Sequence, residues 1–89
     1  MDLDTAIRHA LDGRSVWFKN KPQEVEAAQQ AWRDARADLD AVDGLGRILA
    51  CDRGAHAEAW NGWRRAERRY REAVAAAMRA GHPFEMAPF

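Results

Sequence analysis

Apolar residues recur at alternating steps of three and four along two long stretches of the chain, and this spacing constrains its fold more than any other feature. The first seam contains Val25, Ala28, Trp32, Ala35, Leu39 and Val42. The second seam contains Ala59, Trp63, Ala66, Tyr70, Ala73, Ala77 and Ala80. Residues at these steps share one face of a helix, as they do in coiled coils. The sequence therefore predicts two long amphipathic helices that pack on each other along the two seams.

Residues that flank these stretches predict where the two helices begin and end. Pro22 suits the first position of a helix, and Glu24 and Glu26 suit the positive end of the helix dipole. The second helix is expected over Ala55–Ala80, because the glycine that follows it, Gly81, is a typical C-terminal cap.

The end of the first stretch contains two glycines, within Asp43–Gly46. Each glycine costs a helix interior roughly 1 kcal/mol relative to alanine. The chain is therefore predicted to turn or kink at this segment. One or two further helical turns are expected over Arg47–Cys51 before the second long helix starts.

A short helix is predicted at the N-terminus. Its apolar face contains Leu3, Ile7, Ala10 and Leu11. Asp2 or Asp4 is available as its N-terminal cap, and Gly13 is expected to end it. The apolar run Ser15–Phe18 that follows is interpreted as a connection that plugs the core or as a brief strand. The connection is favoured, because no second strand candidate is found to pair with it.

The last segment, His82–Phe89, is predicted to be irregular and to fold back on the long helices. Its apolar residues are Phe84, Met86 and Phe89. The fold class that follows is all-α, with residues 1–89 forming a single helical domain. An antiparallel helical hairpin of two long helices carries a short N-terminal helix and an irregular apolar C-terminal tail.

Acidic and basic residues balance, with 14 lysines and arginines against 14 aspartates and glutamates. The whole chain therefore has no long-range attraction for nucleic acids or anionic membranes, and any such binding must be local. The acidic start Met1–Asp4 lacks the apolar core of a signal peptide, and the single Cys51 cannot form an intramolecular disulfide. These features favour a cytoplasmic protein. No apolar run approaches the roughly 20 residues that span a bilayer.

Arginines crowd the middle of the second long helix and are the most informative feature for function. The predicted partner-binding residues are Trp60, Arg64, Arg65, Arg68, Arg69 and Arg71. With the second seam turned inward, helical geometry places these arginines along two neighbouring exposed flanks. Arginines four positions apart repel each other by a few tenths of a kcal/mol, which pairing of Glu67 with Arg71 and of Arg68 with Glu72 offsets only in part. An acidic group is therefore expected opposite the cluster.

Three acidic groups are candidates for this role. The first is internal, because the preceding helix contains Asp34, Asp38, Asp40 and Asp43. The second is the acidic surface of a partner protein, since arginine and aromatic residues are enriched at interface centres. The third is the phosphate backbone of DNA or RNA, which the arginine fork matches.

Aromatic residues outside the seams have two interpretations each. A possible secondary patch contains Arg14, Trp17, Lys19 and Lys21, and this mixture is typical of surfaces that stack on unpaired bases. The favoured interpretation makes Trp17 and Phe18 core residues beneath a loop. Trp60 lies near the flank of Val74 and Met78, which is expected to pack within the chain rather than against a second copy.

The titratable residues form no catalytic or metal-binding pattern. His9, His56 and His82 are scattered. Cys51 with His56 supplies two ligands where a structural zinc site requires four. No phosphate-binding glycine loop or nucleotide-binding signature is present. No metal and no cofactor are therefore expected, and the chain is predicted not to be an enzyme.

These inferences favour a small non-enzymatic protein-interaction module or adaptor, with self-association as a homodimer also open. The segment Ala10–Val16, between two predicted helices, is similar to the start of small phage head-tail joining proteins. A phage or mobile-element protein that inhibits a host defence complex is one alternative. A nucleic-acid-binding helical protein that uses the cluster Arg64–Arg71 is the other.

Overall fold

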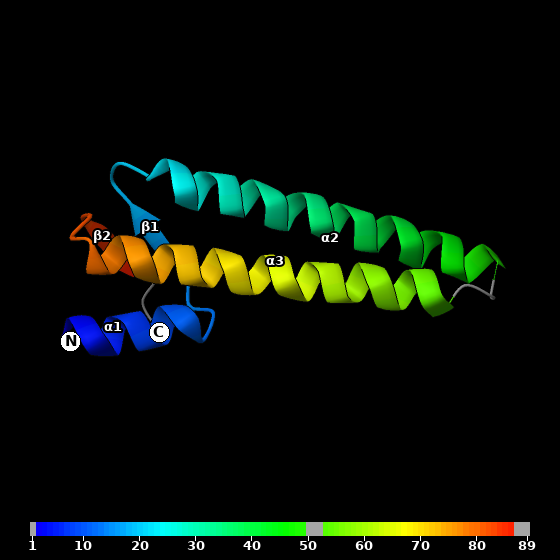
Figure 1. Cartoon of the computed structure of the whole chain (residues 1–89), viewed down its shortest axis with the longest axis horizontal. Helices are drawn as coiled ribbons and strands as arrows, with labels where there is room; N and C mark the ends of the chain where they lie inside the picture. The colour runs from blue at the N-terminus through cyan, green and yellow to red at the C-terminus, as the bar shows by residue number, and fades with distance from the viewer. Residues whose placement is uncertain (1, 50–52, 87–89) are drawn as a thin grey trace.

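A computed structural model describes residues 2–49 and 53–86, which form three helices and one two-stranded sheet. The elements are α1 (Leu3–Leu11), β1 (Val16–Phe18), α2 (Gln23–Leu49), α3 (Arg53–Arg79) and β2 (Phe84–Met86). Helices α2 and α3 lie side by side and antiparallel, and α1 lies along the C-terminal half of α3 on the side away from α2 (Figure 1). The molecule is elongated, with a longest dimension of 49 Å. The predicted all-α hairpin with a short N-terminal helix is confirmed.

The two seams meet inside this hairpin. The ring of Tyr70 stacks on the ring of Trp32, with 5.7 Å between their centroids. Further along, the guanidinium of Arg36 lies over the ring of Trp63 at 5.3 Å. Leu39 of the first seam is buried, with 2% of its surface exposed. The wide layers of the hairpin are therefore filled by aromatic residues from both long helices.

Helix α2 continues through its glycines to Leu49, so of the predicted turn or kink at Asp43–Gly46 the turn is wrong. Helix propensity is a weak preference, and a cost of roughly 1 kcal/mol per glycine does not stop a helix that the preceding turns already propagate. The predicted helical turns over Arg47–Cys51 are confirmed as far as Leu49, and Cys51 lies outside the described residues.

The predicted cap of α1 and the predicted glycine stops after α1 and α3 are confirmed, whereas α3 begins at Arg53 and not at Ala55. Asp2 caps α1, because its Oδ1 accepts a hydrogen bond of 2.8 Å from the backbone N–H of Thr5. The hydrogen bonds from Thr5 lower the pKa of the Asp2 carboxyl. Gly13 ends the turn after α1 with a φ of 100°. Gly81 follows α3 with a φ of 92°, and its N–H donates to the carbonyl of Met78.

Gly13 and Gly62 provide a matched pair of substitutions with opposite expected effects. A Cβ on Gly13 would lie 2.7 Å from Nη2 of Arg71, in a backbone conformation that L side chains rarely adopt. We therefore expect Gly13→Ala to lower the free energy of unfolding by about 1–2 kcal/mol. Gly62 lies inside α3 with open space around it, so Gly62→Ala should raise this free energy by roughly 0.5–1 kcal/mol. Urea denaturation measures both changes, and an unchanged or raised free energy of unfolding in Gly13→Ala contradicts the account of Gly13.

The two strands form an antiparallel ribbon at the same end of the molecule as α1 (Figure 1). The pairs are Val16 with Met86, Trp17 with Glu85 and Phe18 with Phe84. The preference for a plain connection over Ser15–Phe18 is therefore wrong, and so is the expectation that 84–86 is irregular. The tail does fold back on the hairpin, as predicted, and Phe89 lies outside the described residues. Each strand has only three residues, which is shorter than the roughly four to eight residues over which alternation indicates a strand.

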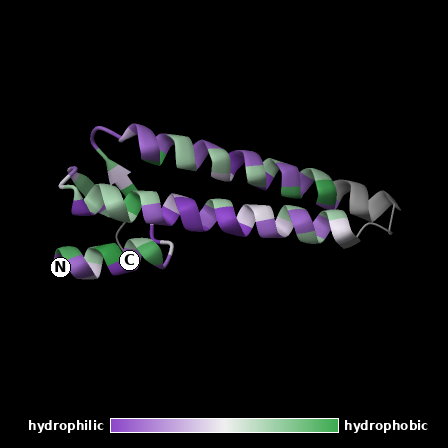
Figure 2. Cartoon of the chain, viewed as in Figure 1, coloured by the Kyte–Doolittle hydropathy of each residue, from purple (hydrophilic) through white to green (hydrophobic). Residues whose placement is uncertain are grey.

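The core lies where α1, the start of α2 and the C-terminal half of α3 meet. Its buried residues are Ala6, Ile7, Ala10, Val25, Val74, Ala75, Ala77 and Met78. Val16 and Phe18 of β1 and Phe84 and Met86 of β2 pack against this cluster. Hydrophobic residues concentrate at this end of the molecule, whereas the middle of α3 is hydrophilic (Figure 2). The expected packing of Val74 and Met78 within the chain is therefore confirmed.

Among the described helices, none has the length and apolar character needed to cross a bilayer.

Candidate functional site

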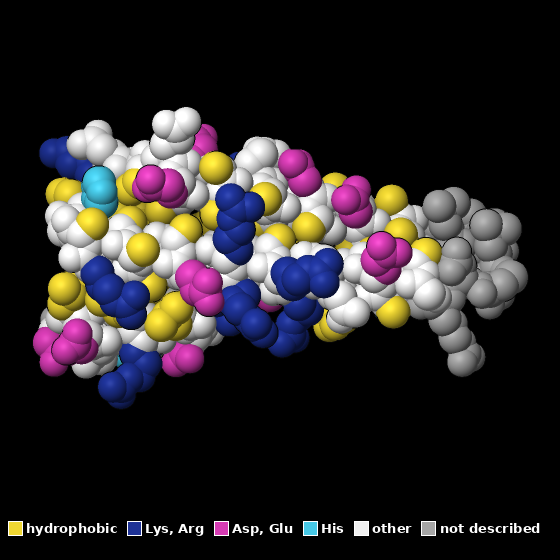
Figure 3. All heavy atoms as spheres, viewed as in Figure 1, with side chains coloured by type: hydrophobic (Ala, Val, Ile, Leu, Met, Phe, Trp, Pro, Cys, Tyr) yellow, Lys and Arg dark blue, Asp and Glu magenta, His cyan; other side chains and the backbone are white. Residues whose placement is uncertain are grey.

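Four exposed arginines of α3, Arg64, Arg65, Arg68 and Arg69, form a surface that we call the arginine face. They lie outside the second seam, whose aromatic residues occupy the side of α3 that contacts α2. Lysine and arginine side chains gather over the middle of α3, while several acidic side chains follow α2 (Figure 3). Basic side chains therefore outnumber acidic ones in α3, whereas acidic side chains outnumber basic ones in α2.

The arginine face has no ion pair with any residue in the ranges 2–49 and 53–86. The ion pairs within these ranges are Arg36 with Asp40, His56 with Asp43, and Arg71 with Glu67. The internal pairing that the sequence offered as a first candidate is therefore not found. Asp40 and Asp43 have other partners, and Asp34 and Asp38 are exposed on α2. The predicted pair of Glu67 with Arg71 is confirmed, whereas Arg68 and Glu72 form none.

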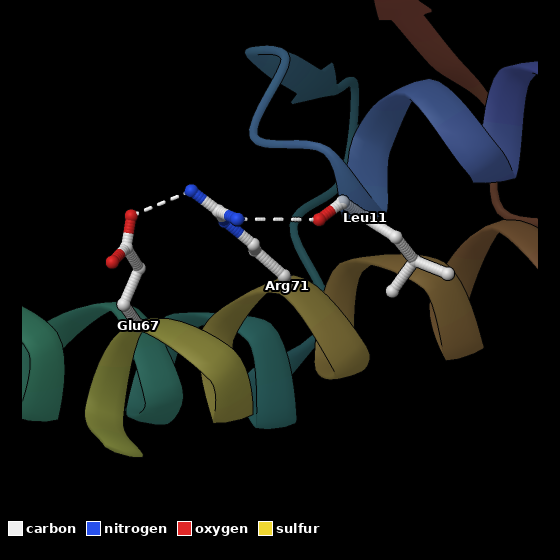
Figure 4. A network of polar contacts seen from close by, with 3 residues as sticks. All are labelled: Leu11, Glu67 and Arg71. Carbon is white, nitrogen blue, oxygen red and sulfur yellow. Dashed lines mark hydrogen bonds and ion pairs between the residues drawn. The ribbon is translucent and has the colours of Figure 1, made fainter. Parts of the chain in front are cut away.

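Arg71 plays a different part from the four arginines of this face. Its Nη2 donates to Oε1 of Glu67 at 2.6 Å, and its Nη1 donates to the backbone carbonyl of Leu11 at 3.3 Å (Figure 4). Leu11 is the last residue of α1, where free carbonyls and the negative end of the helix dipole favour a cation. The structure thus places Arg71 between α1 and α3, where it fixes the end of α1.

A hollow of about 260 Å³ lies where α1 ends beside α3. It is lined by Leu11, Arg64, Glu67, Arg68, Arg71 and Glu72. Arg64 and Arg68 are exposed cations of this lining. The guanidinium of Arg71, in contrast, already donates hydrogen bonds to Glu67 and Leu11. A carboxylate that enters the hollow can therefore meet two guanidinium groups one helical turn apart.

Trp60 adds an aromatic residue to the same flank of α3. It is 42% exposed, and its ring lies 5.1 Å from the ring of Trp63. Trp60 precedes Arg64 by one turn, so the two side chains are neighbours on the helix surface. The flank therefore combines one large exposed aromatic side chain with a row of cations.

The secondary patch is brought together only in part. Trp17 is 59% exposed, so its interpretation as a core residue is wrong, whereas Phe18 packs against the core as expected. Neighbouring residues of a strand point to opposite faces, so the inward side chains of Val16 and Phe18 turn Trp17 outward. Arg14, Trp17 and Lys21 line one cavity, but Lys19 lies in a separate hollow with Pro83 and Glu85.

The cavity that contains most of the secondary patch has a volume of about 470 Å³, and we call it the aromatic cavity. Besides Arg14, Trp17 and Lys21, its lining includes Gln29, Trp32, Glu67, Tyr70 and Arg71. Sequence reasoning missed this site, because its residues come from α1, β1, two connections and both long helices. From the sequence, Trp32 and Tyr70 could be recognised only as residues of the two seams and not as residues of a cavity.

Burial raises the pKa of Tyr70, although the positive charge of Arg33 opposes the shift. Because the pKa is higher in the folded chain than in the unfolded one, the contribution of Tyr70 to stability is intact below the ordinary value of 10.0 and is lost as the pH rises through the folded pKa. Tyr70 is the only tyrosine, so the ultraviolet absorbance of tyrosinate reports it alone. We expect a titration midpoint above 10.0 in the native protein and near 10.0 in denaturant. Coincident midpoints would show that Tyr70 is not desolvated.

Comparison with known protein families, with curated proteins and with solved structures finds no match for this chain. In the described part of the chain, no three histidine, cysteine, aspartate or glutamate side chains are placed to hold a metal ion. His56 pairs with Oδ1 of Asp43 at 2.7 Å and so links α3 to α2. The arginine face and the aromatic cavity are therefore the two surfaces from which function is argued.

Proposed function

We propose that this chain is a non-enzymatic protein-interaction module of the cytoplasm, and that its arginine face and Trp60 bind an acidic surface of a partner protein. The observation that carries this proposal is the exposure of four arginines without an acidic partner in the described part of the chain. Arginines four positions apart repel each other in the free chain. Carboxylates of a partner remove this repulsion and add charge-assisted hydrogen bonds.

The composition of the flank favours a protein partner over nucleic acid. Tryptophan and arginine dominate the binding energy of protein interfaces, and Trp60 lies one turn from Arg64. Glu67 and Glu72 line the hollow beside the same arginines, and they repel the phosphates of a nucleic acid. The chain has no net charge, whereas nucleic-acid-binding domains are commonly basic.

Fluorescence anisotropy with two labelled probes tests this choice of partner. The first probe is a glutamate-rich peptide that contains leucine, and the second is a short DNA duplex. We expect the peptide to bind at low salt with higher affinity than the duplex, and we expect Trp60→Ala to weaken peptide binding. Tighter binding of the duplex, with an affinity that falls steeply as salt is added, would instead assign the arginine face to nucleic acid.

A further inference from the structure

The aromatic cavity has no part in the function proposed above, and its lining suits a different ligand. Its volume of about 470 Å³ falls within the roughly 300–1,000 Å³ that is usual for small-molecule sites. Its walls come from α1, β1, α2, α3 and the connection that follows α1. The packing of α1 and of the ribbon against the hairpin therefore forms this site.

Aromatic rings supply much of the wall. Trp32 and Tyr70 contribute a stacked pair of rings with 5.7 Å between centroids. Trp17 also lines the cavity and leaves 59% of its surface exposed, the largest exposed fraction among the large hydrophobic side chains of the described residues. A flat aromatic ligand would cover apolar area on Trp17 that is now in water, and it would stack on a ring face.

Positive charge exceeds negative charge around the same cavity. The cations are Arg14, Lys21 and Arg71, and the single carboxylate is that of Glu67. Glu67 and Arg71 pair at 2.6 Å and neutralise each other, so Lys21 is a cation of the lining with no carboxylate of the lining left to balance it. The ammonium of Lys21 donates to Oε1 of Gln29 at 2.7 Å, and this bond holds it on the cavity wall.

Aromatic rings and the cation Lys21 therefore lie together in this lining. A ring stacks on the first, and an anionic group pairs with the second, so the lining selects for a ligand that is both flat and anionic.

We infer that the aromatic cavity binds a small planar aromatic molecule that carries a phosphate or a carboxylate group. The ring of the ligand stacks on the aromatic wall, and its anionic group is held by Lys21. Neither Arg64 nor Arg68 lines this cavity, so the site does not depend on the arginine face.

Isothermal titration calorimetry with adenosine monophosphate and 2-naphthoate tests the inference, with adenosine and inorganic phosphate as partial ligands. We expect one of the two anionic aromatic probes to bind one-to-one and at least about tenfold more tightly than either partial ligand. The preferred probe then shows whether the natural anion is a phosphate or a carboxylate. Trp17→Ala and Lys21→Gln should each weaken binding by about fivefold or more, because stacking and a charge-assisted contact are lost.

Trp60→Ala is the matched control, since it removes another exposed tryptophan that lies outside the cavity. It should leave ligand affinity unchanged, and so should the double charge reversal Arg64→Glu with Arg68→Glu. Thermal melts of Trp17→Ala and Lys21→Gln confirm that both variants are folded, as expected for exposed residues. The inference is overturned if neither anionic probe binds at millimolar concentration, if the preferred probe binds no more tightly than adenosine or inorganic phosphate, or if Trp60→Ala weakens binding as much as Trp17→Ala.

Discussion

Replacing Arg64 and Arg68 together with glutamate is expected to abolish recovery of the partner protein while the hairpin stays folded. Both side chains are exposed and neither has an ion pair in the described chain, so their replacement breaks no ion pair within it. Against an acidic partner surface, two glutamates place like charges opposite each other, which costs several kcal/mol. We expect the affinity to fall at least about a hundredfold. Pull-down from the source cell with quantitative mass spectrometry measures recovery, and circular dichroism measures helicity and melting.

A second double variant separates the position of the charges from the net charge. Arg8→Glu with Arg33→Glu changes the net charge by the same amount, at exposed positions of α1 and α2. This control should recover the partner at nearly the wild-type level. Equal losses in both variants would mean that net charge, and not the arginine face, governs binding. A loss of folding in Arg64→Glu with Arg68→Glu would mean that these arginines stabilise the hairpin itself.

The largest effect on stability is expected from Met78→Ala. Met78 is 1% exposed and lies in the buried cluster that joins α1 to α3. Truncating a buried methionine removes apolar contacts and leaves a cavity, which together cost about 2–5 kcal/mol. In a domain of this size such a loss lowers the melting temperature by about 10 °C or more.

Leu3→Ala is the matched control for this core substitution, because Leu3 belongs to α1 but is 46% exposed. Its loss should cost less than about 1 kcal/mol. Chemical denaturation of both variants gives the comparison. If Met78→Ala proved as mild as Leu3→Ala, α1 would not pack on α3 in the way described, and the wall of the aromatic cavity would lose its support.

The helices could be predicted from the sequence because their signals are local and repeated. Each seam extends over several turns, so single exceptions do not hide the period. The ends of α1 and α3 were also predictable, since Asp2, Gly13 and Gly81 act through their own backbone neighbours. The turn predicted at the glycines of α2 was wrong because each glycine costs a helix only roughly 1 kcal/mol. A long helix is cooperative and continues through such a local cost.

The features that escaped prediction depend on residues far apart in the chain. Strands β1 and β2 pair with each other although both long helices separate them in the sequence. A segment of three residues is also too short to show a hydrophobic period. The outward position of Trp17 follows from that pairing, so it was equally hidden. Arg71 looked like the other arginines because nothing in the sequence places the end of α1 beside it. The exposure of the arginine face could be predicted from helical geometry. The lack of an ion pair between this face and the described residues of α2 could be known only from the structure.

Backbone amide chemical shifts, recorded by nuclear magnetic resonance as the recovered partner is added, test the central proposal most directly. We predict that the largest changes fall on α3 between Trp60 and Glu72, and that amides of α2 around Asp34 and Asp38 change little. Changes that concentrate on α2, with this part of α3 unaffected, would contradict the assignment of the arginine face as the binding surface.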